Sequence, residues 1–191
     1  MEQSEGLALF RRAGALLEGH FRLSSGLHST GYLQSALVLQ RPSDAARLGS
    51  AIAERVKDWK IDVVISPALG GLIIGHEVAR ALGVRAIFAE RAGGTSLTLR
   101  RGFTLSPDER ALVVEDVFTT GKSTRETIDV AREAGGNVVG AAAIIDRSGG
   151  TIDLGVPYHT IIQLSLPTYE ADACPLCKRG MPVSKPGSRP G

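Results

Sequence analysis

The chain has 191 residues, which is enough for one compact domain but cramped for two independent ones. Hydrophobic residues make up 43% and charged residues 22%, a balance that excludes intrinsic disorder for most of the chain. The net charge is +2, yet four of the 22 basic residues lie in the last fourteen, so residues 1–177 contain 18 basic and 20 acidic residues. This distribution does not indicate the broad basic surface of a nucleic-acid binder, and we expect no nucleic-acid partner.

Targeting and redox features indicate a cytoplasmic protein. No apolar run reaches the roughly 18 residues that a membrane-spanning helix needs, and the N-terminus is acidic where a secretory signal is basic. Cys174 and Cys177 are too few for a disulfide framework, which agrees with a reducing compartment. We therefore expect a protein of the cytoplasm that binds no membrane.

The first sixty residues contain two helical patterns separated by strand-like sequence. Apolar residues near helical spacing predict a helix over residues 5–18 that ends at Gly19. Residues 21–39 alternate apolar residues with serine, glycine and threonine, which is typical of short strands and turns. From Pro42, apolar residues recur every three or four positions, which predicts a second helix to about Lys60.

After residue 60 the pattern alternates between apolar strands and helices. Strands are predicted over 62–66, 84–89, 97–101, 111–115, 138–145 and 160–164, and helices from Gly71 to Leu82 and over 121–134. Nearly unbroken apolar strands alternating with helices indicate an α/β protein with a mostly parallel, buried sheet. Such sheets bind ligands at the carboxyl ends of their strands, so the loops 66–71, 115–123 and 146–150 are the candidate site.

The loop after the strand at 111–115 carries the clearest chemical signal. The strand ends in Glu115 and Asp116, passes through a hydroxyl- and glycine-rich turn and opens a helix. Free backbone N–H groups, hydroxyls and the positive end of a helix dipole together form a phosphate cradle, while the carboxylates suit ribose hydroxyls or a nearby metal. A P-loop is disfavoured because Asp116 stands where that motif needs glycine. A helix cap with surface acids is the simpler alternative.

Several segments together resemble the type I phosphoribosyltransferase family, in its orotate-using branch. Residues 113–124, with apolar residues, Glu-Asp, two variable positions and Thr-Thr-Gly, resemble that family's signature for phosphoribosyl pyrophosphate (PRPP). Residues 19–26 with Ser29 and Tyr32 resemble its N-terminal hood motif, and 66–71 its pyrophosphate loop. Asp146-Arg147 resembles its base-binding corner, and the Cys-Pro-Leu-Cys tail a short-chain branch.

The resemblance implies a fold and an activity. The expected fold is a single domain over 1–191, α/β with a central mostly parallel β-sheet flanked by helices. A small hood is expected from about 1–40 and 148–175, and an extended tail over 176–191. The implied activity is transfer of the phosphoribosyl group of PRPP to orotate, giving orotidine 5′-monophosphate and pyrophosphate in pyrimidine biosynthesis, through an oxocarbenium-like transition state. The family implies Mg²⁺ as cofactor and a homodimer.

The resemblance also implies roles for particular residues. Glu115 and Asp116 are the expected catalytic pair, holding the ribose hydroxyls beside the developing sugar cation. Thr119 and Arg147 are expected to bind orotate, since a guanidinium can contact the carboxylate or carbonyl edge with two parallel bonds. Mg²⁺ is expected to be held through PRPP and water, without a direct protein ligand. The expected PRPP-binding residues are Arg91, Glu115, Asp116, Val117, Phe118, Thr119, Thr120, Gly121, Lys122 and Ser123, together with Ala68, Leu69, Gly70 and Gly71.

The chain departs from the family pattern in two places. Many relatives have a lysine-rich mobile loop with a histidine, whereas residues 91–101 are short, contain neither, and are patterned like a hairpin with a Gly93-Gly94 hinge. Ser24 stands where many relatives have lysine. These departures bear on the rate and the loop mechanism more than on the reaction class. Two alternatives stay open: a phosphoribosyltransferase for a purine or other base, which Arg147 and the hood motif disfavour, and a non-enzymatic PRPP sensor that binds nucleic acid, which the short loop favours.

The two cysteines have the spacing of half a zinc site. A structural zinc needs four ligands, and two cysteines with four scattered histidines do not identify such a set, although a dimer could pool two pairs. We therefore interpret Cys174-x-x-Cys177 as a turn with small buried thiols, with metal binding as the less favoured alternative. Spacing identifies no partner for the histidines, and a polar core or surface role is expected for each of them: His20, His28, His76 and His159.

Overall fold

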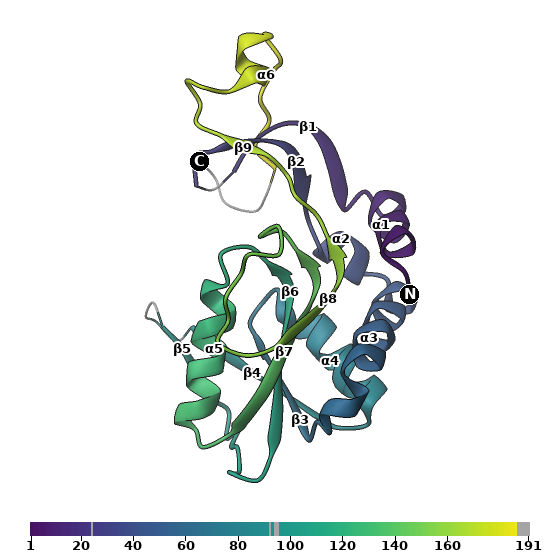
Figure 1. The fold of residues 1–191 in the computed structure, drawn as a ribbon, viewed down its shortest axis with the longest axis vertical. Coiled ribbons are helices and arrows are strands. Elements are labelled where there is room, and N and C mark those ends of the chain that lie inside the picture. Colours follow the sequence, from purple (N-terminus) through teal and green to yellow (C-terminus); the bar gives the residue numbers. More distant parts are fainter. Residues whose placement is uncertain (24, 92, 94–95, 187–191) are drawn as a thin grey trace.

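The computed structural model describes residues 1–23, 25–91, 93 and 96–186. These residues form two parts, a core and a hood. In Figure 1 the core forms the lower part of the molecule and the hood the upper part, where β1 and β2 lie beside β9 and α6. None of the helices in these ranges is long and apolar enough to cross a membrane.

The core is built on a six-stranded sheet in the order β5-β4-β3-β6-β7-β8. All neighbouring strands run parallel except β5, which is antiparallel to β4 at one edge. This arrangement confirms the predicted α/β fold with a mostly parallel central sheet. The strands are β3 (Val63–Pro67), β4 (Arg85–Arg91), β5 (Leu97–Leu99), β6 (Arg110–Phe118), β7 (Asn137–Asp146) and β8 (Tyr158–Gln163).

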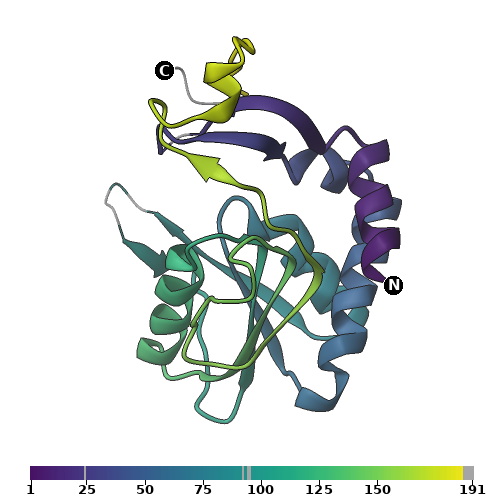
Figure 2. The ribbon, with the colours of Figure 1, turned by 45° about the horizontal axis from the view of Figure 1, so that its top comes forward.

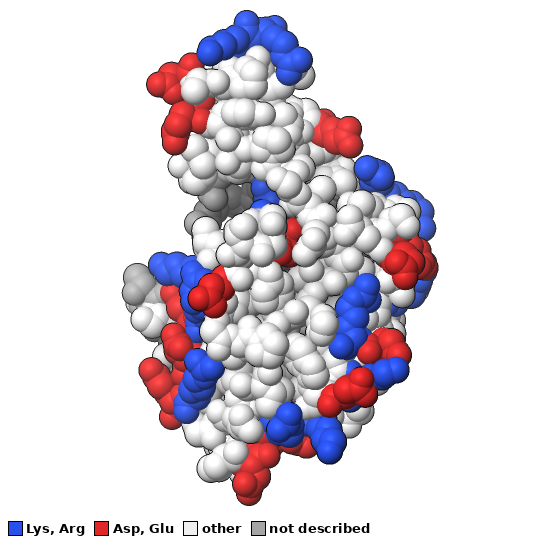
Figure 3. All heavy atoms as spheres, viewed as in Figure 1, with Lys and Arg blue, Asp and Glu red and all other residues white. Residues whose placement is uncertain are grey.

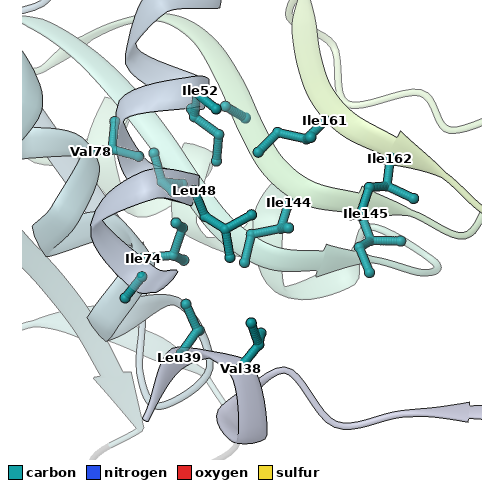
Figure 4. Close-up of a cluster of buried hydrophobic side chains, with 14 of the residues drawn as sticks. Val38, Leu39, Leu48, Ile52, Ile74, Val78, Ile144, Ile145, Ile161 and Ile162 are labelled. Atoms are coloured by element: carbon teal, nitrogen blue, oxygen red, sulfur yellow. The ribbon is translucent and has the colours of Figure 1, made fainter. Parts of the chain in front are cut away.

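Helices cover both faces of this sheet because the strands are apolar on both sides. Along β6, Leu112 and Val114 belong to one buried cluster, while Ala111 and Val113 belong to the other. The first cluster lies under α1 (Gln3–Arg12), α3 (Pro42–Val56) and α4 (Gly71–Leu82), and Figure 4 shows its aliphatic side chains meeting between helices and sheet. The second lies under α5 (Lys122–Glu133). A short 3-10 turn, η1 (Lys57–Trp59), follows α3.

The hood is a three-stranded antiparallel sheet formed by segments from opposite ends of the chain. Strand β2 (His28–Leu33) pairs with β1 (Leu16–Arg22) on one side and with β9 (Thr168–Tyr169) on the other. The short helices α2 (Ala36–Leu39) and α6 (Pro175–Lys178) lie at its two ends, and Figure 2 shows the hood arching over one end of the core.

Three segments differ from their predicted structure. The first helix ends at Arg12, because the chain turns at Ala13 and Gly14 and residues 16–18 join the hood hairpin as strand. The hood does not begin at residue 148: the stretch to 157 packs Leu154 into the core, and β8 is an edge strand of the central sheet. The tail is not simply extended either, since it forms α6 and then pairs Ser184 with Phe21 of β1. Residues 187–191 lie outside the described ranges.

Candidate active site

The carboxyl end of β6 places the two predicted catalytic acids in different surroundings. Glu115 is buried, at 5% exposure, and its Oε2 accepts a hydrogen bond of 2.8 Å from Ser123 Oγ of α5. Asp116 is half-buried, and its Oδ1 accepts a bond of 2.9 Å from the backbone N–H of Val117. One carboxyl is therefore tied to the helix that follows, and the other faces the cavity beside the loop 66–71.

The surroundings of Glu115 favour its protonated form. Burial, and then the neighbouring Asp116 carboxylate, raise the pKa of Glu115 to about 8, while the Ser123 hydrogen bond opposes the shift. A buried carboxyl with a pKa of about 8 can change protonation when a cationic ligand arrives. This behaviour is typical of a functional site.

The raised pKa predicts that stability falls as pH rises. The folded state binds the Glu115 proton more tightly than the unfolded chain, whose carboxyl titrates near 4.5, so the free energy of unfolding decreases between about pH 4.5 and pH 8. We expect Glu115→Gln, which cannot ionise, to remove this part of the decrease, on the order of a few kcal/mol because one pKa unit corresponds to about 1.4 kcal/mol. Urea denaturation across this pH range measures the difference. The exposed Glu133→Gln on α5 is the control, and parallel pH slopes for the wild type and Glu115→Gln would show that the pKa is not raised.

The loop after β6 forms an anion cradle at the start of α5. Gly121 is the N-cap with φ +74°, a left-handed conformation, and a Cβ there would lie 2.7 Å from Ile152 Cδ1. Thr119 and Thr120 are exposed, and the first turn of α5 supplies backbone N–H groups that have no partner within the helix. One of them, the N–H of Lys122, donates to Thr120 Oγ1 at 3.4 Å. The helix dipole adds positive potential at the same place.

Arg125 fixes the shape of this cradle through two backbone carbonyls. Its Nη2 donates to Thr120 O and its Nη1 to Asp153 O, both at 2.7 Å, so one guanidinium joins the loop after β6 to the segment before β8. Arg125 therefore acts as a positioning residue, because it holds the loop without itself facing the ligand.

Loss of this clamp should weaken binding at the cradle more than turnover. We expect Arg125→Ala to raise KM for a phosphorylated substrate about tenfold with kcat within about threefold, since the loop N–H groups lose their preset arrangement. Steady-state kinetics measures the split. Arg132→Ala, on the same helix and exposed, is the matched control and should behave as the wild type. A fall in kcat with unchanged KM would contradict the positioning role.

The loop between β3 and α4 lies directly beside these acids. A Cβ on Gly70 would lie 2.9 Å from Asp116 Oδ1, and one on Gly71 would lie 2.8 Å from Val114 O, so the chain approaches β6 as closely as glycine permits. The Ala68–Leu69 peptide bond is cis, and Leu69 is 83% exposed. Asp116, Leu69 and Gly70 line a cavity of about 250 Å³ together with residues of α2 and α4. The predicted pyrophosphate loop and the predicted catalytic pair are thus neighbours.

A larger cavity of about 530 Å³ lies between hood and core. Its charged group is Arg147, which follows β7 and is held there by a 2.8 Å bond from its backbone N–H to Phe118 O. The Nε atom of Arg147 is buried and has no hydrogen-bond partner among the described residues, and burial lowers the pKa of this guanidinium. A half-buried cation that forms no ion pair among the described residues calls for an anionic ligand. The cavity is lined by Leu23, Ser25, Leu27, Tyr32, Thr119, Thr120, Arg147, Leu166 and Thr168.

Comparison with known proteins identifies the family to which this chain belongs. A family profile described as phosphoribosyl transferase domain matches residues 38–158. The orotate phosphoribosyltransferase of Caldanaerobacter subterraneus subsp. tengcongensis is 51% identical over 189 residues, which cover 99% of both chains. That of Rhizorhabdus wittichii is 53% identical over 192 residues, which cover 99% of this chain and 97% of the relative. The chain belongs to the orotate phosphoribosyltransferase family.

A solved structure of the orotate phosphoribosyltransferase family supports the same assignment at the level of the fold. The Mycobacterium tuberculosis enzyme, in complex with 5-phospho-α-D-ribosyl 1-diphosphate (PRPP), matches with a TM-score of 0.66 at 27% identity. The match covers 85% of this chain and 96% of that chain. The resemblance stated from sequence motifs is therefore confirmed at the level of family and fold.

Most of the site residues predicted from the family pattern lie together in the structure. Residues 68–71, 115–123 and 147 stand at the carboxyl ends of β3, β6 and β7, which are adjacent in the sheet. Thr119 and Arg147 line the same cavity, as expected for a shared ligand. Their individual ligand contacts stay predictions.

The arginines of residues 91–101 form ion pairs of their own, unlike the predicted site residues at the carboxyl ends of the strands. Arg91 ends β4 and donates a 2.7 Å bond to Glu126 of α5, and it lines neither of the two cavities just described. Arg101 forms two bonds to Glu90, of 2.9 and 3.0 Å, and Arg100 lies 3.7 Å from the same carboxylate. The predicted hairpin is present as β4 and β5, while Gly94 of its hinge and Ser24 lie outside the described residues.

Sequence reasoning missed part of the cavity wall. Leu27 was not assigned a role, and Leu166 and Thr168 come from the opposite end of the chain, where no motif marks them. Tyr32 was noted only as part of the hood motif. The available signal was the apolar and hydroxyl character of the hood segments, which becomes informative only once β9 is known to pair with β2.

Proposed function

We propose that this chain transfers the phosphoribosyl group of PRPP to orotate, as a cytoplasmic step of pyrimidine nucleotide synthesis. The observation that carries the proposal is the half-buried guanidinium of Arg147, whose buried Nε has no partner among the described residues and which lines a cavity beside the anion cradle. Orotate has a carboxylate that such a group can pair with, whereas purine bases have none. Two free cysteines are consistent with a reducing compartment.

Each part of PRPP has a complementary element in this arrangement. The cradle at Thr119–Ser123 suits the 5′-phosphate, and the loop 68–71 suits the pyrophosphate because both offer backbone N–H groups. Glu115 and Asp116 lie between them and suit the ribose hydroxyls. As the bond from the anomeric carbon to pyrophosphate breaks and the bond to a ring nitrogen of orotate forms, positive charge develops on the sugar. The nearby Asp116 carboxylate would stabilise that charge, and Glu115 would add to this when it loses its proton.

The residues present fit a magnesium ion that arrives with the substrate. No cluster of three or more His, Cys, Asp or Glu ligand atoms converges at Glu115 and Asp116 among the described residues, so the chain offers carboxylates but no closed cage. Mg²⁺ usually keeps several waters and binds through one or two carboxylates plus phosphates. When bound with the substrate, it would neutralise charge on the departing pyrophosphate, and Asp116 is the carboxylate that would help to hold it.

A homodimer is proposed to complete the site. The β4–β5 hairpin extends from the edge of the core in Figure 2, and its arginines line neither cavity of their own chain. Arg100 and Arg101 are exposed by more than half, so they are available to a second copy. Sedimentation velocity at assay concentration tests the proposal, and an active monomer would contradict it.

Pyrophosphate release from PRPP tests the function directly. The protein is incubated with PRPP, Mg²⁺ and one base at a time: orotate, adenine, guanine or hypoxanthine. We expect release with orotate alone. Release with a purine instead would leave the fold assignment intact but overturn the substrate. Binding of PRPP without release with any base would favour a PRPP sensor.

A further inference from the structure

Four metal-ligating side chains meet inside the hood, away from the proposed active site. They are His20 of β1, His28 of β2, Cys174 at the start of α6 and Cys177 within it. One ligand atom from each lies within 4.8 Å of all the others, the one such convergence of His, Cys, Asp and Glu among the described residues. The sequence placed the histidines about 150 residues from the cysteines and identified no partner for them.

The separations between these atoms fit one tetrahedral ion. His20 Nε2 lies 2.8 Å from His28 Nδ1, 3.5 Å from Cys174 Sγ and 3.7 Å from Cys177 Sγ, and Cys177 Sγ lies 3.3 Å from His28 Nδ1. A tetrahedral zinc with bonds of about 2.0–2.1 Å to nitrogen and about 2.3 Å to sulfur holds its ligands roughly 3.3–3.8 Å apart. The three separations that involve sulfur lie in this range, whereas the two imidazole nitrogens, at 2.8 Å, would move apart by about 0.5 Å on binding. We infer that the hood binds a structural Zn²⁺ through His20, His28, Cys174 and Cys177.

The local backbone is arranged to bring the four ligands together. Arg22 pairs with His28 across the β1–β2 ladder, and His20, two residues earlier in β1, contacts His28 diagonally. On the other side, Pro175 starts α6 directly after Cys174, and Cys-x-x-Cys around one tight turn is the usual half of a zinc site.

A hydrogen bond from the Nδ1 atom of His20 leaves its Nε2 atom to bind a metal. Its Nδ1 lies 2.9 Å from the carbonyl oxygen of Met181, so Nδ1 carries the proton and Nε2 presents its lone pair to the cluster. Carbonyl partners of this kind orient most metal-bound histidines. Two cysteines that lose their protons on binding supply two negative charges, which neutralise a divalent cation in a region that is largely buried.

Burial favours a structural ion over a catalytic one. His20, His28 and Cys174 are 4%, 6% and 0% exposed, while Cys177 reaches the surface and provides the route by which the ion enters. Four protein ligands leave no open position for a substrate. Two nitrogen and two sulfur ligands in a tetrahedron favour Zn²⁺ over Mg²⁺ or Ca²⁺, which prefer oxygen.

The ion would join the two chain ends where they form the base cavity. His20 and His28 flank the turn of the hood hairpin, which contributes Leu23, Ser25 and Leu27 to the wall of the larger cavity. Beyond α6, the N–H of Ser184 donates to His20 O, and the N–H of Arg22 donates to Ser184 O, each at 2.9 Å. A bound zinc therefore fixes the hairpin and the C-terminal segment as one unit above the site.

Metal content of the untagged protein tests the inference without reference to activity. We expect about one zinc per chain by mass spectrometry after growth in zinc-containing medium, and a content reduced at least tenfold in Cys174→Ser and Cys177→Ser. His76→Ala, an exposed histidine of α4 outside the cluster, is the matched control and should keep its zinc. Absence of zinc from the wild type, or equal zinc in the cysteine variants, would overturn the site.

Cobalt substitution keeps the test valid if a cysteine variant fails to fold. The wild-type protein loaded with Co²⁺ should show thiolate-to-metal charge-transfer absorption and the intense visible bands of tetrahedral cobalt, and Zn²⁺ should displace them. Octahedral, oxygen-bound spectra would overturn the site. Circular dichroism confirms that each variant is folded.

A kinetic readout, which rests on the proposed function, tests the role of the ion in the base cavity. Zinc removal from the wild type by a chelator, followed by restoration of Mg²⁺, should raise KM for orotate about tenfold and leave KM for PRPP within about twofold. Equal KM values for orotate with and without zinc would overturn this role. The zinc content of the wild type and the cysteine variants would still decide whether the site binds zinc.

Discussion

Replacement of Arg147 by alanine should lower kcat/KM for orotate by roughly 30- to 5,000-fold. The substitution removes the buried charge of the larger cavity, and truncating one partner of a buried, hydrogen-bonded charge pair costs about 2–5 kcal/mol. The substrate carboxylate would then enter the cavity without a cation. KM for PRPP should change less than about threefold, because the phosphate cradle and the loop 68–71 remain. Steady-state kinetics with each substrate varied in turn measures both parameters.

Arg147→Lys is the informative control for this prediction. Lysine keeps the positive charge but cannot form two parallel bonds to a carboxylate, so we expect activity between that of the wild type and of the alanine variant. A loss of less than about threefold in Arg147→Ala would show that the unpartnered guanidinium does not bind the base.

Replacement of Asp116 by asparagine should lower kcat by about 100- to 1,000-fold, because a preset charge near a developing cation commonly contributes this much to catalysis. Asp116 is the more exposed member of the acidic pair and lies against the loop 68–71, where the leaving group is proposed to bind. Asparagine keeps the size of the side chain and its ability to accept the hydrogen bond from Val117. The loss should therefore reflect charge and not local structure.

The matched control for this variant is Asp129→Asn, an exposed acid on α5. It makes the same change of charge outside the site and should leave kcat within about twofold. If Asp116→Asn raised KM for PRPP without lowering kcat, Asp116 would be a binding residue and not a catalytic one.

The sequence was sufficient to place the core of the site because its signals are local. In β6 an unbroken apolar run ends at Glu115, and a hydroxyl- and glycine-rich turn opens α5 directly afterwards. In a parallel sheet the carboxyl ends of neighbouring strands meet, so Arg147 after β7 had to lie beside Thr119 after β6. Both observations follow from periodicity and strand direction, and the structure confirms them.

The hood could not be predicted in the same way, because its contacts join residues far apart in the chain. Thr168 pairs with Ser29, and Cys177 meets His28 across nearly 150 residues, and no local spacing connects these positions. Helical spacing also continued past Arg12 into residues that pair as strand, since pairing with β2 outweighed local propensity.

The ion pairs on the core surface could not be predicted from the sequence either. In Figure 3, basic and acidic side chains are interspersed over the visible face of the core. The pairing of Arg91 with Glu126 belongs to this pattern, and it could not be read from the family motif that assigned Arg91 to pyrophosphate. The described arrangement places Arg91 in an ion pair of its own chain, so its contact with pyrophosphate stays a prediction.

Pyrophosphate release from PRPP with orotate or with uracil as the acceptor tests the central claim most directly. The two bases share the pyrimidine ring and differ in the carboxylate that Arg147 is proposed to pair with. Wild-type protein should release pyrophosphate with orotate and show a kcat/KM for uracil lower by at least about 100-fold, in line with a lost buried charge pair. Equal rates with the two bases would contradict the account, because the buried guanidinium would then play no part in choosing the substrate.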